Sequence, residues 1–110
     1  MITINIKRND KNEIVSFMLD GHAGYAKKGN DILCAAVSAV TNMVLIGFNQ
    51  LDVTPKCEMS DGGFLSCELP QNLTGDVQTK LQFLLECMVN EFMDIKNSYG
   101  KYIKVIQESA

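Results

Sequence analysis

The sequence has a single histidine among its 110 residues, and its four cysteines form no Cys-x-x-Cys pair. Zinc sites made of cysteine and histidine need closely spaced ligand pairs, so this sequence does not match their patterns. We therefore expect neither a metal nor a cofactor. The scarcity of histidine also means that any reaction pairing a cysteine with a histidine base must use His22.

The chain also lacks an excess of basic residues. Ten Lys and Arg residues against thirteen Asp and Glu residues give a formal charge of 10 − 13 = −3, which argues against direct binding of nucleic acid. The longest apolar run, residues 35–48, is interrupted by polar side chains and is too short for a membrane span. The N-terminus lacks the basic-then-apolar order of a signal peptide. These absences predict a cytoplasmic protein without membrane contact, and the length predicts one domain over residues 1–110.

The cysteines are expected to be thiols, because the cytosol is reducing. Cys57 and Cys67 flank a predicted hairpin turn and could face each other across it, but two half-buried strand thiols are the favoured interpretation. Cys87 falls on an apolar helical stripe and is expected in the core.

Hydrophobic periodicity predicts five strands and two helices. The predicted elements are strands over 1–7 and 13–20, a helix over 32–49, strands over 52–60 and 64–69, a helix over 74–98 and a strand over 101–107. This order, β-β-α-β-β-α-β, predicts an α+β, two-layer sandwich with a mixed or antiparallel sheet and two helices, most simply on one face. The first helix is apolar on nearly every side, so we expect it to be contacted on several sides.

A cysteine, Cys34, lies where the first helix should begin. If Asp31 or Asn30 is the N-cap, Cys34 falls in the first turn, where backbone N–H groups and the helix dipole favour an anion. That setting lowers the pKa of a thiol, and the nearby N–H groups are natural donors to an oxyanion. A small buried cysteine and a hydrogen-bonded loop histidine are the alternative, which these residues alone leave open.

Two motifs carry a resemblance to a known family. They are Gly21-His22-Ala23-Gly24-Tyr25 and Asp31-Ile32-Leu33-Cys34-Ala35-Ala36-Val37-Ser38-Ala39. Together they resemble the signature of the Prp family, the bacterial ribosomal-processing cysteine proteases, and the resemblance covers essentially the whole chain. It favours a cysteine endopeptidase in which Cys34 is the nucleophile and His22 is first general base and then general acid, acting through a thioester.

The resemblance also implies a substrate and a partner. The substrate would be the N-terminal extension of the twenty-seventh protein of the large ribosomal subunit, cut after a pair of phenylalanines and before a small residue. An apolar pocket near Cys34 and a homodimer are implied as well. A ribosome-associated module that binds peptides without cleaving them is the alternative, and a redox thiol protein would need a resolving cysteine that no local spacing supplies.

Several residues have supporting roles in this interpretation. Asp31 is expected to cap the helix, although it could instead orient His22 as a third catalytic residue, a role for which Asp20 is a rival. Ser38 lies one turn beyond Cys34 and could hydrogen-bond near the site. The connector between strand and helix is expected to gate substrate entry, through Gly21, Ala23, Gly24, Tyr25, Gly29 and Asn30.

Overall fold

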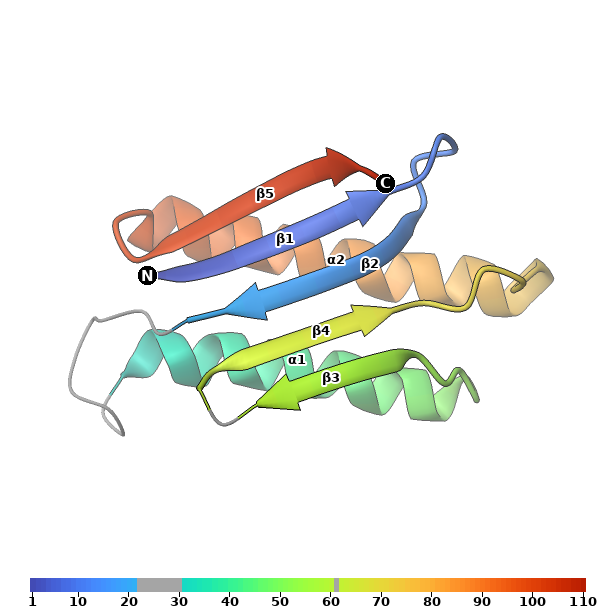
Figure 1. Cartoon of the computed structure of the whole chain (residues 1–110), viewed down its shortest axis with the longest axis horizontal. Coiled ribbons are helices and arrows are strands. Elements are labelled where there is room, and N and C mark those ends of the chain that lie inside the picture. The colour runs from blue at the N-terminus through green and yellow to red at the C-terminus, as the bar shows by residue number, and fades with distance from the viewer. Residues whose placement is uncertain (22–30, 61) are drawn as a thin grey trace.

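The chain was analysed as a computed structural model, which describes residues 1–21, 31–60 and 62–110. Its elements are β1 (Ile2–Arg8), β2 (Ile14–Asp20), α1 (Ile32–Gln50), β3 (Lys56–Ser60), β4 (Phe64–Glu68), α2 (Gly75–Tyr99) and β5 (Ile103–Ser109) (Figure 1). The predicted order is confirmed, with boundary shifts. The largest shift is at β3, which begins after Pro55 and not at Asp52, because Asp52 turns the chain with a φ of 55° and proline cannot donate to a ladder.

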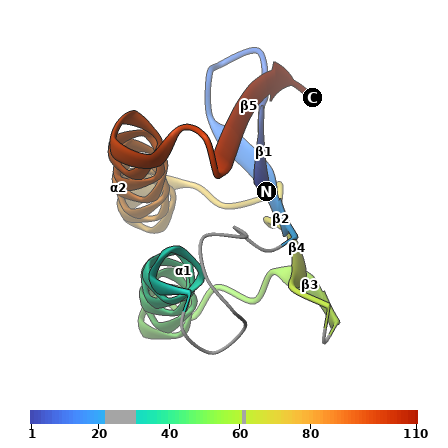
Figure 2. The ribbon, with the colours of Figure 1, turned by 90° about the vertical axis from the view of Figure 1, so that its left-hand side faces the viewer.

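The five strands form one mixed sheet in the order β3-β4-β2-β1-β5. Neighbours pair antiparallel except β1 and β5, which are parallel. Viewed along the layers, both helices lie on the same face of the sheet (Figure 2). The α+β two-layer prediction is confirmed.

The core lies between the sheet and the helices. Alternation along β1 turns Ile2, Ile4 and Ile6 toward the helices, where they are at most 3% exposed, as the period of a strand requires. The helices contribute side chains at helical spacing to the same core: Leu33, Val37, Val44 and Phe48 from α1, and Leu81, Leu85, Met88, Val89 and Phe92 from α2. One face of each helix therefore packs on the sheet.

The expectation that α1 is contacted on several sides is wrong. Its buried residues recur on the face toward the sheet, whereas Ile32, Met43 and Ile46 are 54%, 56% and 53% exposed. Two helices side by side on one sheet form a single layer, and no further layer of the described chain lies outside it (Figure 2). An apolar face of α1 is thus left open.

Residues 35–48 were expected to be too short for a membrane span. The whole helix α1, however, is long and apolar enough to cross a membrane by length and composition alone. This is weak evidence, because the core helix of a soluble protein passes the same test. Here 28% of the window is buried, on the face where Val37, Val44 and Phe48 join the core.

Two expectations about cysteines are also wrong. Cys57 and Cys67 are bonded as a disulfide, because the register of β3 and β4 places them directly opposite each other, with Cα atoms 4.2 Å apart. Cys87 is exposed and not part of the core. Cys34, like Cys87, is outside any disulfide.

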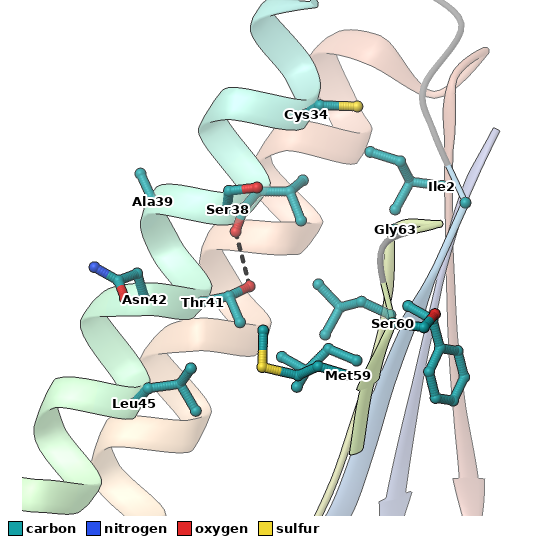
Figure 3. Close-up of a pocket in the computed structure, with 15 residues that line it drawn as sticks. Ile2, Cys34, Ser38, Ala39, Thr41, Asn42, Leu45, Met59, Ser60 and Gly63 are labelled. Carbon is teal, nitrogen blue, oxygen red and sulfur yellow. Dashed lines mark hydrogen bonds between the residues drawn. The ribbon is translucent and has the colours of Figure 1, made fainter. Parts of the chain in front are cut away.

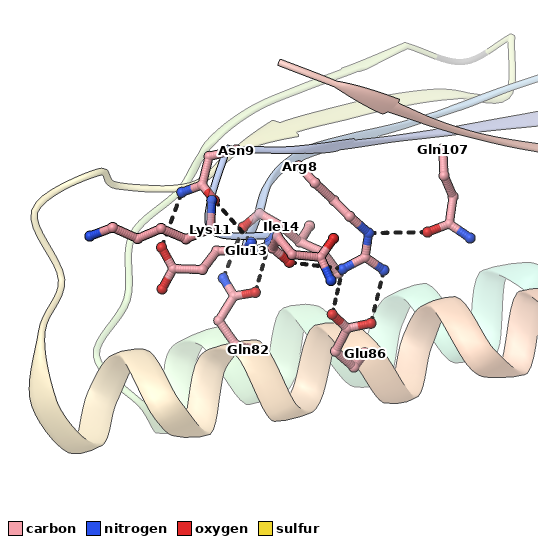
Figure 4. Close-up of polar contacts among 9 residues, drawn as sticks. Arg8, Asn9, Lys11, Glu13, Ile14, Gln82, Glu86 and Gln107 are labelled. Carbon is pink, nitrogen blue, oxygen red and sulfur yellow. Dashed lines mark hydrogen bonds and ion pairs between the residues drawn. The ribbon is translucent and has the colours of Figure 1, made fainter.

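A polar cluster joins α2 to the hairpin of β1 and β2 (Figure 4). The Arg8 guanidinium donates two hydrogen bonds to the Glu86 carboxylate, which lowers the pKa of Glu86 and raises that of Arg8. Gln82 donates to the Ile14 carbonyl at 2.9 Å and accepts from the Ile14 N–H at 2.8 Å. We call Arg8, Ile14, Gln82 and Glu86 the Arg8 cluster.

Candidate active site

Cys34 lies in the first turn of α1, as predicted. Asp31 is the N-cap, and its Oδ1 accepts hydrogen bonds from the N–H groups of Leu33 at 3.0 Å and Cys34 at 3.1 Å. The prediction of Asp31 as the helix cap is confirmed. The cap fixes the direction of the first turn and, with it, the direction of the Cys34 side chain.

The N–H groups in the first turn of α1, which were expected to donate to an oxyanion, already have acceptors in this structure, and the donor role stays a prediction. The N–H groups of Leu33 and Cys34 are bonded to the Asp31 side chain, and that of Ala35 is bonded to the Asp31 carbonyl at 3.2 Å. All three are therefore occupied in this state. A carboxylate at a helix N-terminus competes for the same donors as an oxyanion would.

Cys34 opens into a groove of about 620 Å³ between α1 and the sheet. Its sulfur points from α1 toward the space beside Ile2, and Leu45 and Met59 point into the same space farther along (Figure 3). The apolar lining is completed by Leu19, Val37 and Leu65. Ser38 also lines the groove, so the structure brings it near Cys34 as predicted. An apolar groove beside a thiol suits an extended peptide with large apolar side chains.

The hairpin of β3 and β4 forms one wall of this groove. Met59, on β3, is 73% exposed, and β3 is an edge strand that pairs only with β4. Sequence reasoning did not single out Met59. A signal for it was available in the sequence. Met59 is an apolar residue between polar neighbours on a strand that begins after Pro55, and a proline at that place indicates an edge strand.

Gly21 connects the end of β2 to this wall. Its N–H donates to the Gly63 carbonyl at 3.1 Å, its φ is +99°, and a Cβ placed on it would overlap the Met1 carbonyl oxygen. Only glycine fits this position without strain. The residue that precedes His22 is therefore fixed by contacts on both sides.

His22 itself lies outside the described residues, as do Ala23, Gly24, Tyr25, Gly29 and Asn30. The residues that bracket this segment are described. Gly21 lines the groove, and Asp31 caps the helix that carries Cys34. Both attachment points of residues 22–30 therefore lie next to the groove.

Within the described ranges, no group of three or more His, Cys, Asp or Glu side chains is placed to hold a metal ion. The described residues bring together at this site the Cys34 thiol, which is outside a disulfide, the capping carboxylate of Asp31 and an apolar groove.

Comparison with known proteins finds close likenesses. The profile of the family described as cysteine protease Prp matches residues 1–104. The ribosomal processing cysteine protease Prp of Bacillus subtilis is 34% identical, with 96% of each chain covered. Two crystal structures of the essential ribosomal processing protease Prp from S. aureus cover 97% of this chain and 99% of theirs. The structure with a covalently linked product peptide has a TM-score of 0.88 at 28% identity, and the one with a substrate peptide has 0.81 at 26%.

Proposed function

The chain belongs to the Prp family of ribosomal-processing cysteine proteases, and from this premise we propose that Cys34 is its nucleophile and His22 its general base and acid. His22 takes the thiol proton as sulfur bonds to the carbonyl carbon of the scissile peptide. The C–N bond then breaks, and the imidazolium protonates the leaving amine. Water, deprotonated by His22, cleaves the thioester to release the acid and restore the thiol.

The observation that carries the assignment is that Cys34 is not joined in a disulfide and lines the apolar groove. Cys57 and Cys67 are joined to each other. Cys87 is free but exposed on α2, outside the residues that line the groove. A nucleophile needs both a thiol and a surface that holds substrate against it, and Cys34 combines them.

We further propose that the substrate is the N-terminal extension of the twenty-seventh protein of the large ribosomal subunit, cut after Phe-Phe and before a small residue. The apolar lining supports aromatic residues beside the scissile bond, since burying each phenylalanine removes a large apolar area from water. The similar S. aureus protease has been crystallised with substrate and product peptides, which supports a peptide in this groove.

The remaining predictions stand as part of this proposal. Asp31 caps α1, and a second role in orienting His22 is proposed for its carboxylate. Gly21 and the segment 22–30 are proposed to control substrate entry, with Ser38 as a polar contact beside the thiol. We propose that the enzyme works in the cytoplasm as a homodimer.

A cleavage assay tests the proposal. A synthetic peptide with an apolar segment ending in Phe-Phe-Ala is incubated with the wild type, Cys34→Ala, His22→Ala and, as a matched control, Cys87→Ala. Mass spectrometry should find two fragments with the wild type and Cys87→Ala, and intact peptide with the other two. Cleavage by Cys34→Ala would refute the assignment, and binding without cleavage by the wild type would favour the non-enzymatic peptide-binding module.

A further inference from the structure

The disulfide lies beside one wall of the groove. Cys57 and Met59 are two residues apart on β3, so their side chains point to the same face of the strand. The residues directly opposite them on β4 are Cys67 and Leu65. Met59 and Leu65 both line the groove. The disulfide is therefore the next pair along the hairpin, on the side that faces the groove.

The strand that carries Met59 gains little from the core. β3 is an edge strand that pairs only with β4, and all five residues of Lys56–Ser60 are exposed. Burial of apolar side chains is the main favourable term in folding, and segments with few buried contacts open locally at a low cost in free energy. The disulfide is thus the covalent link that keeps β3, with Met59 on it, against β4.

The other end of this link is firmly held. Cys67 is 1% exposed and belongs to the core. Its strand pairs with β2 as well as with β3, and the N–H group of Leu69, just after β4, donates to the Val15 carbonyl at 2.9 Å. A buried thiol packs as a small apolar side chain, so the core can hold Cys67 in either oxidation state. Reduction would release β3 without removing a core residue.

We propose that the Cys57–Cys67 pair positions the β3 wall of the groove, and that its oxidation state controls how tightly the groove binds an apolar peptide. In the disulfide form, Met59 is held in place for the peptide. In the dithiol form, β3 opens locally, and only molecules with the wall in place bind well. The proposal rests on the proposed peptide site, but not on the chemistry of Cys34 and His22.

The exchange is a two-electron reaction with a small monothiol such as glutathione. Its thiolate attacks the sulfur of Cys57, the exposed member of the pair. The S–S bond breaks, and the Cys67 sulfur leaves with the electron pair and takes a proton from water. A second thiolate attacks the glutathione sulfur of the mixed disulfide, which releases Cys57 and forms oxidised glutathione. The reverse exchange with oxidised glutathione restores the bond.

The setting of the pair suits reversible control. Disulfides of cytosolic proteins are usually transient, with catalytic or redox-sensing roles, and we propose that this enzyme works in the cytoplasm. Exposed disulfides are the ones that exchange readily with cellular thiols. Because Cys57 is exposed on an edge strand, a thiol can approach it from solvent.

A peptide-binding measurement tests the proposal. The protein is the double variant Cys34→Ala, Cys87→Ala, whose remaining cysteines are Cys57 and Cys67. The Phe-Phe-Ala peptide of the cleavage assay is labelled with fluorescein, and fluorescence anisotropy gives its dissociation constant. The oxidised protein should bind roughly 10-fold more tightly than the protein reduced with millimolar glutathione. Reoxidation with oxidised glutathione should restore the tight binding.

Three controls accompany this measurement. Cys57→Ser in the same background should bind as the reduced protein does, with or without glutathione. Hydrogen exchange should become faster in residues 56–60 on reduction and stay unchanged in β1, which shows that the rest of the fold persists. Alkylation followed by mass spectrometry should find both cysteines modified after treatment with reduced glutathione.

Equal and tight binding by the oxidised and reduced forms would overturn this proposal alone. If neither form bound the peptide, both this proposal and the proposed peptide site would be wrong. Unchanged exchange in residues 56–60 would mean that the disulfide does not hold β3, and faster exchange in β1 would assign the effect to global unfolding. A bond that resists millimolar glutathione would rule out control by oxidation state.

Discussion

The Arg8 cluster and the Cys34 groove, near opposite ends of β1, are held together by different interactions. At the Arg8 cluster, side chains of α2 bond to β1 and to the start of β2 through Glu86 and Gln82. At the Cys34 groove, the described polar contacts include the Asp31 cap at the start of α1 and the backbone bond from Gly21 to Gly63, and neither joins α1 to the sheet.

The contrast shows how this small protein divides stability and binding between two regions. Bonds from α2 close the space between helix and sheet at the Arg8 cluster. Beside Cys34, α1 and the β3–β4 hairpin leave a groove of about 620 Å³ with an apolar lining. Apolar surface that stays exposed to water contributes nothing to the free energy of folding. Proteins often keep such less stable surfaces where their activity needs them.

Gly21→Ala should have the largest effect on the groove. The new Cβ would overlap the Met1 carbonyl and strain a φ of +99°. We expect a loss of about 2–5 kcal/mol in the free energy of unfolding, from left-handed strain and overpacking, and a fall in peptide cleavage of about 100-fold. Chemical denaturation and the peptide assay measure the two effects.

Gly62→Ala is the matched control, because a Cβ there meets nothing within 4 Å. It should leave both quantities nearly unchanged. If Gly21→Ala behaved like Gly62→Ala, Gly21 would not be the fixed point from which the His22 segment leaves the sheet.

Reduction of the Cys57–Cys67 disulfide should be next in size. The bond closes a hairpin with a sequence separation of 10, for which the chain-entropy relation gives about 2–3 kcal/mol. Thermal melts with and without dithiothreitol should differ for the wild type and coincide for Cys57→Ser. Equal melts for the wild type would mean that the two thiols are not bonded in solution.

Asp31 substitutions separate its two proposed roles. Asp31→Ala should lower the free energy of unfolding by about 1 kcal/mol through loss of the cap, and Asp31→Asn should restore most of it, since asparagine also caps helices. If the carboxylate also orients His22, Asp31→Asn should remain slow in peptide cleavage. Full activity of Asp31→Asn would limit Asp31 to the cap.

The smallest effect should come from the Arg8 cluster. The hydrogen bonds from Arg8 hold the pKa of Glu86 below its ordinary value of 4.5. A carboxyl whose pKa is lower in the folded state than in the unfolded state stabilises the fold at any pH above the unfolded-state pKa. This contribution disappears as the pH falls through the folded-state pKa. Because the Glu86 side chain is 41% exposed, we expect about 0.5–1 kcal/mol at pH 7.

Urea denaturation of Glu86→Gln at neutral and acid pH measures this effect. The difference from the wild type should shrink as the pH falls below about 4. Glu91→Gln, at an exposed position of the same helix, should show no such difference. A difference independent of pH would mean that Glu86 acts through packing and not through its charge.

The features that sequence reasoning predicted correctly are those that depend on local pattern. Alternation of Ile2, Ile4 and Ile6 predicted β1, and Asp31 before an apolar run predicted the start and cap of α1. The features it missed depend on which elements become neighbours. Cys57 and Cys67 meet only because the hairpin takes one register among several, and Cys87 is exposed only because α2 turns a different face to the sheet.

The sequence alone determined the order of elements, the single candidate base and the position of Cys34 in a helical first turn, because spacing and capping act within a few residues. The tertiary structure alone decided that Leu45 and Met59 border one groove with Cys34, and that α1 keeps an apolar face uncovered. These outcomes depend on packing between distant segments, and no local pattern specifies which side of a uniformly apolar helix the sheet will cover.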